Sequence, residues 1–351
     1  MTRWAVVLAG GVGSRFWPLS TPTRPKQLLP LVTDAPLLVD AVSRLDPLVP
    51  ADRVLILTNR ALVPAIAELL PAIPRENLIA EPRAGGTAAA LTWAAQEIAR
   101  RDGPTAVMIS VHADWAVADA DGFRAALEHG AELAERQHAL VTVGVVPTRA
   151  DPGFGYIQPG DSLAKLSGGR EARTVKRFVE KPDRARAEEM RRDGYLWNSG
   201  IFAWRVGDFL DDVRQLTPEV APALHAHAND IDGFFAAVTP VSVDVGVLER
   251  SQRVAVLAGD FGWDDVGTWG ALKRVRPNDA QGNASHGHVY TIEAHNNVVH
   301  APGTKVVLYG VSDVVVVVED GLVLVTTVDK SSDLKTLMDA LPRGVREHES
   351  A

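Results

Sequence analysis

The stretch AVVLAGGVGSR (residues 5–15) joins a short apolar run to a glycine-rich turn that ends on an arginine. The apolar run predicts a buried β-strand, and glycines directly after a strand let backbone N–H groups approach phosphate oxygens closely. Arg15 and Lys26 can neutralise charge on the same phosphates. No Gly-Lys-Ser/Thr follows, so this is not a Walker A loop. The stretch predicts a triphosphate site, although the glycines alone fit a tight turn equally well.

Apolar runs and helical patterns alternate through the first 150 residues. Strands are predicted at residues 5–9, 54–59, 106–111 and 140–145, and helices at residues 37–49, 61–70, 87–101 and 123–137. Such alternation predicts parallel strands covered by helices. Right-handed crossovers then give a Rossmann-like, doubly wound α/β fold, in which ligands bind beyond the carboxyl ends of the strands.

Turn signals and shorter runs replace this alternation after residue 151. Strands are predicted at 174–180 and 199–205, where they extend the same sheet and make it mixed. A charged helix is predicted at 183–192, opened by Pro182, and further helical turns at 218–228 and 231–237. These segments are expected to wall the ligand pocket.

A second change comes after Pro277, where pairs of apolar residues recur eight positions apart. The pairs are Val298-Val299, Val306-Val307, Val314-Val315 and Leu322-Val323. Short stacked strands explain this spacing better than helices do. We therefore predict a catalytic domain over residues 1–278, a small β-domain over 279–342 with a closing helix at 333–341, and a polar tail over 343–351.

Composition narrows the class of protein. A chain of 351 residues with 46% hydrophobic and 23% charged residues is typical of a soluble globular protein with more than one core. The sequence has no cysteine, which excludes thiol chemistry and fits a reducing, cytoplasmic location. The net charge of −8 argues against a nucleic-acid surface. No apolar segment is long enough to predict a membrane span or a signal peptide.

Two carboxylate positions suit a hard cation. Asp114 follows the predicted strand 106–111, so its carboxylate is expected near the ligand crevice. Asp264 and Asp265 form a second group that could complete a Mg²⁺ site together with phosphate oxygens and water. A lone aspartate is more often a turn or cap residue.

Two further motifs fit a phosphorylated sugar. Glu180 at a strand end can accept hydrogen bonds from sugar hydroxyls, and Lys181 can hold a phosphate as a point charge. Asn198, in Trp-Asn-Ser-Gly, would place an amide where a sugar ring can lie against close backbone. Taken alone, this second motif is more often a β-turn.

Taken in order, these segments resemble the mannose-1-phosphate guanylyltransferase (GDP-mannose pyrophosphorylase) family of sugar nucleotidyltransferases, over nearly the whole chain. The marks are LAGGVGSRFWPLSTPTRPKQLLPL (8–31), ENLIAEP (76–82), GFGYIQPG (153–160), VKRFVEKPD (175–183), YLWNSGIFAW (195–204) and DFGWDDVGTW (260–269). The FWPLS and PKQ segments, with WNSGIF, are more similar to guanylyl enzymes than to adenylyl, uridylyl or thymidylyl relatives.

The resemblance implies three groups of binding residues. The nucleotide group is Leu8, Gly10, Gly11, Gly13, Ser14, Arg15, Lys26, Glu81, Pro82 and Thr87, with Arg15 and Lys26 also catalytic. The sugar-phosphate group is Gly155, Glu180, Lys181, Asn198 and Asp244, and the Mg²⁺ ligands are Asp114 and Asp265. The C-terminal segment is implied to be a short left-handed β-helix.

Two positions depart from the family pattern. The family commonly has Pro-x-Asp-His around the metal aspartate, and this chain has His112-Ala113-Asp114-Trp115. The family's Asn-Thr-Ala is replaced by Gly86-Thr87-Ala88. Neither change removes a residue that is predicted to be catalytic.

The implied activity is transfer of GMP from GTP to mannose 1-phosphate, by Mg²⁺-dependent in-line attack on the α-phosphate. Alternatives are the same chemistry with another pair, such as a different nucleoside triphosphate and glucose 1-phosphate, or a non-catalytic ligand-sensing subunit. A phosphomannose isomerase domain is not expected, because the segment after the domain boundary is too short. Valine-rich strand edges at the C-terminus favour a homodimer. No nucleic-acid or membrane partner is expected.

Overall fold

The computed structural model describes residues 1–11 and 14–346, in which the chain forms two compact units. The first unit comprises residues 1–10, 42–112 and 119–261, and the second comprises residues 11–41, 113–118 and the segment from Gly262 onward. Both units are discontinuous in sequence. The predicted β-domain of residues 279–342 falls within the second unit.

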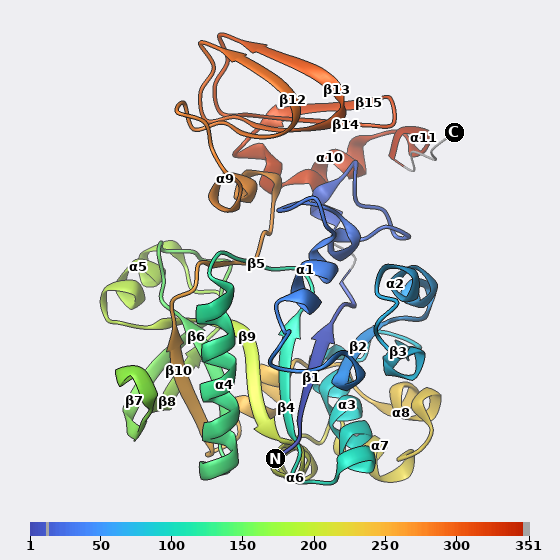
Figure 1. Cartoon of the computed structure of the whole chain (residues 1–351), viewed down its shortest axis with the longest axis vertical. Helices are drawn as coiled ribbons and strands as arrows, with labels where there is room; N and C mark the ends of the chain where they lie inside the picture. Colours follow the sequence, from blue (N-terminus) through green and yellow to red (C-terminus); the bar gives the residue numbers. More distant parts are fainter. Residues whose placement is uncertain (12–13, 347–351) are drawn as a thin grey trace. The chain divides into compact units, whose positions relative to one another are not determined.

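Within the described residues, the first unit is built on a nine-stranded mixed sheet (Figure 1). Its strands are β1 (Arg3–Leu8), β2 (Val54–Asn59), β3 (Leu78–Glu81), β4 (Val107–His112), β6 (Leu140–Val145), β7 (Tyr156–Lys165), β8 (Glu171–Val179), β9 (Leu196–Arg205) and β10 (Val254–Gly259). They lie in the order β3-β2-β1-β4-β9-β6-β10-β8-β7. The prediction of an α/β fold with a large mixed sheet is confirmed.

The N-terminal half of that sheet is parallel, as the alternating pattern predicts. β1 pairs in parallel with β2 and β4, and β2 pairs in parallel with β3. The later strand β9 is inserted antiparallel between β4 and β6. β4 and β6 are both antiparallel to β9, so they run in the same direction, as the parallel arrangement predicted for the first 150 residues requires. The insertion of β9 between them was not predicted, because alternating runs do not reveal a strand from further along the chain.

Helices cover both faces of this sheet. They are α2 (Val63–Leu69), α3 (Gly86–Asp102), α4 (Ala120–Gln137), α5 (Arg184–Arg192), α6 (Val206–Leu216), α7 (Ala221–Ala226) and α8 (Ile231–Ala237). Successive strand residues point to opposite faces. On one face Trp204 stacks on Phe209 of α6, with ring centroids 4.4 Å apart. On the other face the Cβ of Ala203 lies against Gly130 of α4.

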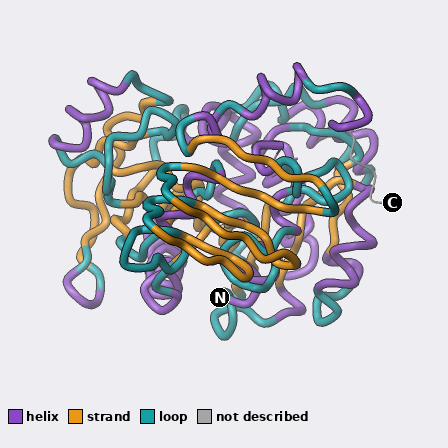
Figure 2. The backbone as a smooth tube through the Cα atoms, turned by 90° about the horizontal axis from the view of Figure 1, so that it is seen from above, coloured by secondary structure: helices purple, strands orange, loops and turns teal. Residues whose placement is uncertain are grey.

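The second unit contains a four-stranded C-terminal sheet in its described part. Its strands are β12 (Ala284–Ile292), β13 (Val298–Tyr309), β14 (Val314–Glu319) and β15 (Leu322–Thr327). β12, β13 and β14 pair in parallel, and β15 is antiparallel to β14. The unit also contains the short pair β5 (Ala116–Val117) and β11 (Trp263–Asp264), and the helices α9 (Leu272–Val275), α10 (Leu334–Ala340) and α11 (Arg343–Arg346). Figure 2 shows the strands in orange from above.

The strands predicted between Val298 and Val325 are present, but the eight-residue recurrence does not measure their stacking, so that part of the interpretation is wrong. Val298 and Val306 lie on the same strand, β13. The residue paired with Val298 on the next strand is Val315, and the one paired on the previous strand is Ala284. The strand is long enough to carry two apolar pairs, separated by Pro302-Gly303 in an exposed stretch.

Buried polar side chains bind the turns of the second unit together. Asn297 donates from Nδ2 to Asn283 Oδ1 over 2.9 Å, and its own Oδ1 accepts from the backbone of Val314. Arg276 donates to the carbonyl of Leu31 and contacts Nδ1 of His300. Burial and the Arg276 charge lower the pKa of His300 to about 3. The segment that carries the predicted phosphate residues is thereby tied to β13.

The helix α1 (Leu37–Ser43) carries the chain from the second unit into the first.

In the described residues, no helix combines the length and the apolar character needed to cross a membrane.

Candidate functional site

The predicted residues are distributed over both units, and each group is described within its own unit. In the first unit, Glu81 ends β3 and Gly10 follows β1. A Cβ on Gly10 would lie 3.6 Å from Oε1 of Glu81, so the carboxylate is next to the glycine backbone. Burial raises the pKa of the Glu81 carboxyl to about 7. A half-buried carboxyl at the carboxyl ends of parallel strands suits recognition of a ligand's N–H groups.

Thr87 links the start of α3 to the segment before Asp244. Its hydroxyl oxygen accepts from the backbone N–H of Val243 over 2.9 Å. Gly86, directly before it, has φ +80°, and a Cβ there would lie 2.3 Å from the carbonyl oxygen of Val241. The glycine at this departure from the family pattern is therefore required by the close approach of the two backbones. Leu8 ends β1 and Pro82 directly follows β3, at the same edge of the sheet.

The sugar-phosphate group comes together in the first unit. Asn198 donates from Nδ2 to Asp244 Oδ1 over 2.6 Å, and from its backbone N–H to the carbonyl of Gly155 over 2.8 Å. A Cβ on Gly155 would lie 2.8 Å from Oε2 of Glu180. Lys181, at φ 44°, forms an exposed ion pair with Glu180 over 2.9 Å.

A β-bulge places Asn198. The pairing of β6 with β9 runs from Val143↔Ile201 directly to Gly144↔Asn198, so the register shifts. Gly200, at φ +74°, supplies the backbone conformation that the bulge needs. Ser199 fixes it by donating to the carbonyl of Val143. Bulges often re-aim a side chain beside an active site.

Charged neighbours surround Asp244. Burial raises its pKa, the Asn198 hydrogen bond opposes that rise, and the charge of Glu180 adds to it. Two residues that the sequence analysis missed act on this group: His112 lowers the pKa of Asp244, and the pKa of Glu249 is raised by burial and by Asp244. Their distance along the chain leaves no local sequence signal. The carboxyl and amide groups of Asp244 and Asn198, which are hydrogen-bonded to each other, suit the hydroxyls of a sugar.

An aromatic and cationic cluster adjoins this group in sequence. The Arg149 guanidinium lies 4.9 Å from the Trp197 ring centroid and 5.4 Å from that of Phe154. It also donates to Asp151. Arg149 thus contacts the aromatic residues directly before Gly155 and Asn198, and no local sequence pattern marks it.

In the second unit, Lys26 is a buried cation. It lies in a short 3₁₀ turn, and its side chain is 8% exposed. Nζ donates to Asp114 Oδ2 over 3.0 Å and to the backbone carbonyl of Asp265 over 2.6 Å. The Phe16 ring lies 5.9 Å away. The predicted phosphate cation thus contacts both residues that are predicted to bind the metal.

The two adjacent aspartates differ in their surroundings. Asp264 is buried, forms an ion pair with Arg274 over 2.6 Å, and accepts from the backbone N–H of Val266. Val266 has φ +47°, a strained value for a β-branched residue. Asp264 therefore holds the turn, and Asp265, which is only partly buried, is placed by that turn.

The number of carboxylates near Lys26 suits Mg²⁺. Between residues 1–11 and 14–346 no three His, Asp or Glu side chains gather as a metal-binding cluster. Magnesium is commonly held by one or two carboxylates, with phosphate and water oxygens completing the octahedron. Asp114 and Asp265, which share Lys26 as a neighbour, fit that pattern.

The glycine-rich turn is described only in part. Gly11 is exposed, and a Cβ on it would meet nothing within 4 Å. Arg15, in the 3₁₀ turn Ser14–Phe16, is exposed. Gly13 and the side chain of Ser14 lie outside the described residues.

Comparisons with known proteins give one consistent family. Residues 4–282 match the nucleotidyl transferase family. The mannose-1-phosphate guanylyltransferase of Escherichia coli K12 is 34% identical over 98% of this chain and 75% of its own length. The xanthan biosynthesis protein XanB of Xanthomonas campestris pv. campestris B100 is 35% identical over 96% of this chain and 72% of its own. The chain thus spans about three quarters of these relatives.

Solved structures agree in fold. A Thermus thermophilus protein, described as a mannose-1-phosphate geranyltransferase, superposes with a TM-score of 0.86 at 34% identity, covering 99% of this chain and 98% of its own. A Helicobacter pylori mannose-6-phosphate isomerase structure has a TM-score of 0.59 at 22% identity, covering 75% of this chain and all of its own, and shows similarity of fold alone.

Proposed function

Because the chain belongs to the nucleotidyl transferase family, and within it to the mannose-1-phosphate guanylyltransferases, we propose that it transfers GMP from GTP to mannose 1-phosphate, giving GDP-mannose and pyrophosphate. The observation that carries the proposal is the contact of the buried Lys26 with Asp114 and with the carbonyl of Asp265. In this position the lysine charge can neutralise a phosphate oxygen, and the two aspartates beside it can hold a divalent metal that binds the same phosphates.

The proposed reaction is a single in-line displacement. An oxygen of mannose 1-phosphate forms a bond to the α-phosphorus of GTP, and the bond from that phosphorus to the α,β-bridging oxygen breaks. Pyrophosphate leaves with the bonding electrons. The attacking oxygen is already anionic, so no general base is required. Positioning and charge neutralisation by Arg15, Lys26 and backbone N–H groups then account for the rate.

Each cluster has a proposed role. Glu81, Pro82 and Thr87 receive the guanine, and the glycine-rich turn with Arg15 and Lys26 receives the phosphates. The sugar phosphate is received by the cluster of Gly155, Glu180, Lys181, Asn198 and Asp244. The hydrogen-bonded carboxyl and amide groups of this cluster support a polyhydroxylated ligand.

Asp114 and Asp265 are the proposed ligands of Mg²⁺. When bound, the ion would neutralise charge on the phosphate oxygens during displacement. Neighbouring residues position these two ligands: Lys26 keeps Asp114 oriented, and Asp264 holds the turn that carries Asp265.

Three finer proposals concern the whole protein. The parallel pairing of β12, β13 and β14 supports a short left-handed β-helix. Exposed apolar residues on β12 and β13, among them Tyr290, Val307 and Tyr309, support a homodimer through this sheet. The absence of cysteine supports a cytoplasmic location.

The experiment that tests this function measures pyrophosphate release with Mg²⁺. Four nucleoside triphosphates are crossed with mannose 1-phosphate and glucose 1-phosphate. Release that is strongest with GTP and mannose 1-phosphate supports the proposal. A different best pair retains the chemistry and refutes the specificity, and absence of release with every pair favours a ligand-sensing subunit.

A further inference from the structure

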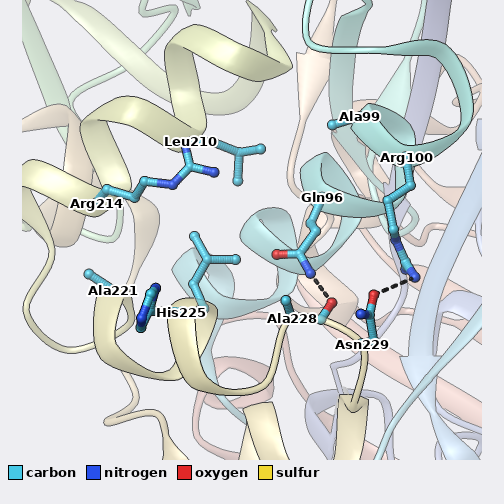
Figure 3. Close-up of a pocket in the computed structure, with 10 residues that line it drawn as sticks. Gln96, Ala99, Arg100, Leu210, Arg214, Ala221, His225, Ala228 and Asn229 are labelled. Atoms are coloured by element: carbon cyan, nitrogen blue, oxygen red, sulfur yellow. Dashed lines mark hydrogen bonds between the residues drawn. The ribbon is translucent and has the colours of Figure 1, made fainter.

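A cavity of about 660 Å³ opens among helices of the first unit (Figure 3). Of the ligand-binding residues predicted from the sequence, these helices carry only Thr87, at the start of α3. Helices α3, α6 and α7 and the loop after α7 supply its walls. The lining residues are Gln96, Ala99, Arg100, Leu210, Arg214, Ala221, Leu224, His225, Ala228 and Asn229. Its volume lies in the range of sites for small organic ligands.

The ionisable residues of this lining are all basic. Arg100, Arg214 and His225 line the cavity, and none of its lining residues is an aspartate or a glutamate. The whole chain carries a net charge of −8, so a cavity whose ionisable lining residues are all basic departs from the general character of the molecule. Local positive charge of this kind favours an anionic ligand.

The two arginines differ in how firmly they are paired. Arg214 pairs with Asp211 over 2.9 Å, and the two side chains are 55% and 58% exposed. Arg100 pairs with Glu97, which is only 19% exposed and also pairs with Arg101. A pair between two exposed side chains contributes little free energy. A phosphate, which accepts two parallel hydrogen bonds from a guanidinium, can therefore compete with Asp211 for Arg214.

The cavity also has an apolar part. Leu210 and Leu224 line it although they are only 4% and 5% exposed, and Ala99 and Ala221 lie beside them. In Figure 3 Arg214 and Leu210 lie on one side of the cavity, and Gln96 and Arg100 lie on the opposite side. A small inorganic anion would leave this apolar surface uncovered. A ligand with a flat apolar ring would cover it.

Hydrogen bonds fix the loop that forms the rim. Gln96 donates from Nε2 to the carbonyl of Ala228, and Arg100 contacts Asn229 Oδ1 over 3.5 Å. Both bonds join α3 to the loop after α7, so the cavity is formed before any ligand enters. A preformed site avoids part of the ordering cost of binding.

We propose that this cavity binds an organic anion of nucleotide size, with its phosphate at Arg214 and its ring against Leu210 and Leu224. The site is separate from the proposed catalytic residues. Binding there does not depend on the chain being a guanylyltransferase.

The test is calorimetric titration of the full chain with GMP and, separately, with inorganic phosphate. Arg214→Ala removes the anion contact, and Ala221→Trp fills the cavity without changing charge. Arg186→Ala is the matched control, because Arg186 is also an exposed helical arginine paired with a carboxylate three residues away. Amide hydrogen exchange locates the bound GMP on the chain.

We expect GMP to bind this site with a dissociation constant at or below about 1 mM, and to protect residues 96–100 and 210–229 from exchange. Arg214→Ala and Ala221→Trp each weaken that binding at least about tenfold, a difference of about 1.4 kcal/mol, whereas Arg186→Ala does not. Inorganic phosphate binds at least about tenfold more weakly than GMP.

GMP binding that both cavity variants leave unchanged, or protection elsewhere only, overturns the proposal. Equal affinity for inorganic phosphate overturns the apolar part of it. The two proposals can fail separately. If the chain has no guanylyltransferase activity but binds GMP, and Ala221→Trp removes that binding, the catalytic proposal fails and the cavity proposal stands.

Discussion

Lys26 places a positive charge where its side chain is almost completely buried, against Asp114 and a backbone carbonyl. We expect Lys26→Met to lower kcat by about a hundredfold, which corresponds to about 3 kcal/mol of transition-state stabilisation, the scale of removing one preorganised donor. Arg24→Ala is the local control, because Arg24 is exposed and pairs with Glu319. Steady-state pyrophosphate release measures both. A Lys26→Met protein with near-normal kcat would refute the catalytic role.

Glu81 makes stability depend on pH. Its pKa in the folded chain is about 7, above the ordinary value of 4.5, because burial disfavours the carboxylate. Below about pH 4.5 Glu81 is protonated in both states and does not lower the free energy of unfolding. As the pH rises from about 4.5 through 7, the free energy of unfolding falls by up to about 3 kcal/mol. Glu81→Gln removes this dependence. Urea unfolding should show the variant gaining stability relative to the parent between pH 5 and pH 8. An unchanged difference across that range would contradict the raised pKa.

Asp264 and Asp265 are neighbours for which we predict opposite effects. Asp264→Ala breaks the ion pair with Arg274 and the cap on the strained Val266, and we expect it to lower the free energy of unfolding by about 2 kcal/mol. Asp265→Ala should change stability by less than about 0.5 kcal/mol and abolish most turnover. Denaturant unfolding and kcat of the two variants provide the comparison. Equal losses of stability would show that the two residues share one structural role.

At the scale of the element, the two ends of α3 provide a matched pair of glycines. Gly86 and Gly103 both have positive φ, but only at Gly86 would a Cβ collide with another backbone, that of Val241. Gly103, at φ 82° and ψ 171°, lies in a region that is essentially confined to glycine, so Gly103→Ala should cost about 2 kcal/mol from backbone strain alone. Gly86→Ala should cost at least about 2 kcal/mol more. If thermal and urea unfolding give equal losses, the close approach to Val241 is absent in solution.

The elements with strong local signals were predictable. Pro182 and the charged pattern after it predict α5, for which the structure shows Asp183 as the N-cap, and the helical pattern at residues 87–101 predicts α3. The β-bulge that presents Asn198 was not predictable, because it depends on how β9 pairs with β6, far away in the sequence. The strand β7 was also missed, since exposed polar residues interrupt its apolar pattern.

At the scale of the whole molecule, the sequence places the site residues on the chain but does not group them. Gly155, Glu180, Asn198 and Asp244 come together through three separate contacts that no local pattern reveals. Glu249 was not identified for the same reason. The predicted stacking period failed because β13 is long enough to carry two of the repeated valine pairs. A single segment shows its local propensity for helix or strand, but it does not show which distant segment it pairs with.

The central claim is that a mannose 1-phosphate oxygen attacks the α-phosphorus of GTP. Two reactions with mannose 1-phosphate and Mg²⁺ test it most directly, one with GTP labelled in the α-phosphate and one with GTP labelled in the γ-phosphate, with products separated by chromatography. We predict that the α-label appears in GDP-mannose and the γ-label in pyrophosphate, without label on the protein. A γ-label in inorganic phosphate or in the sugar product, or an α-label bound covalently to the chain, would contradict the account.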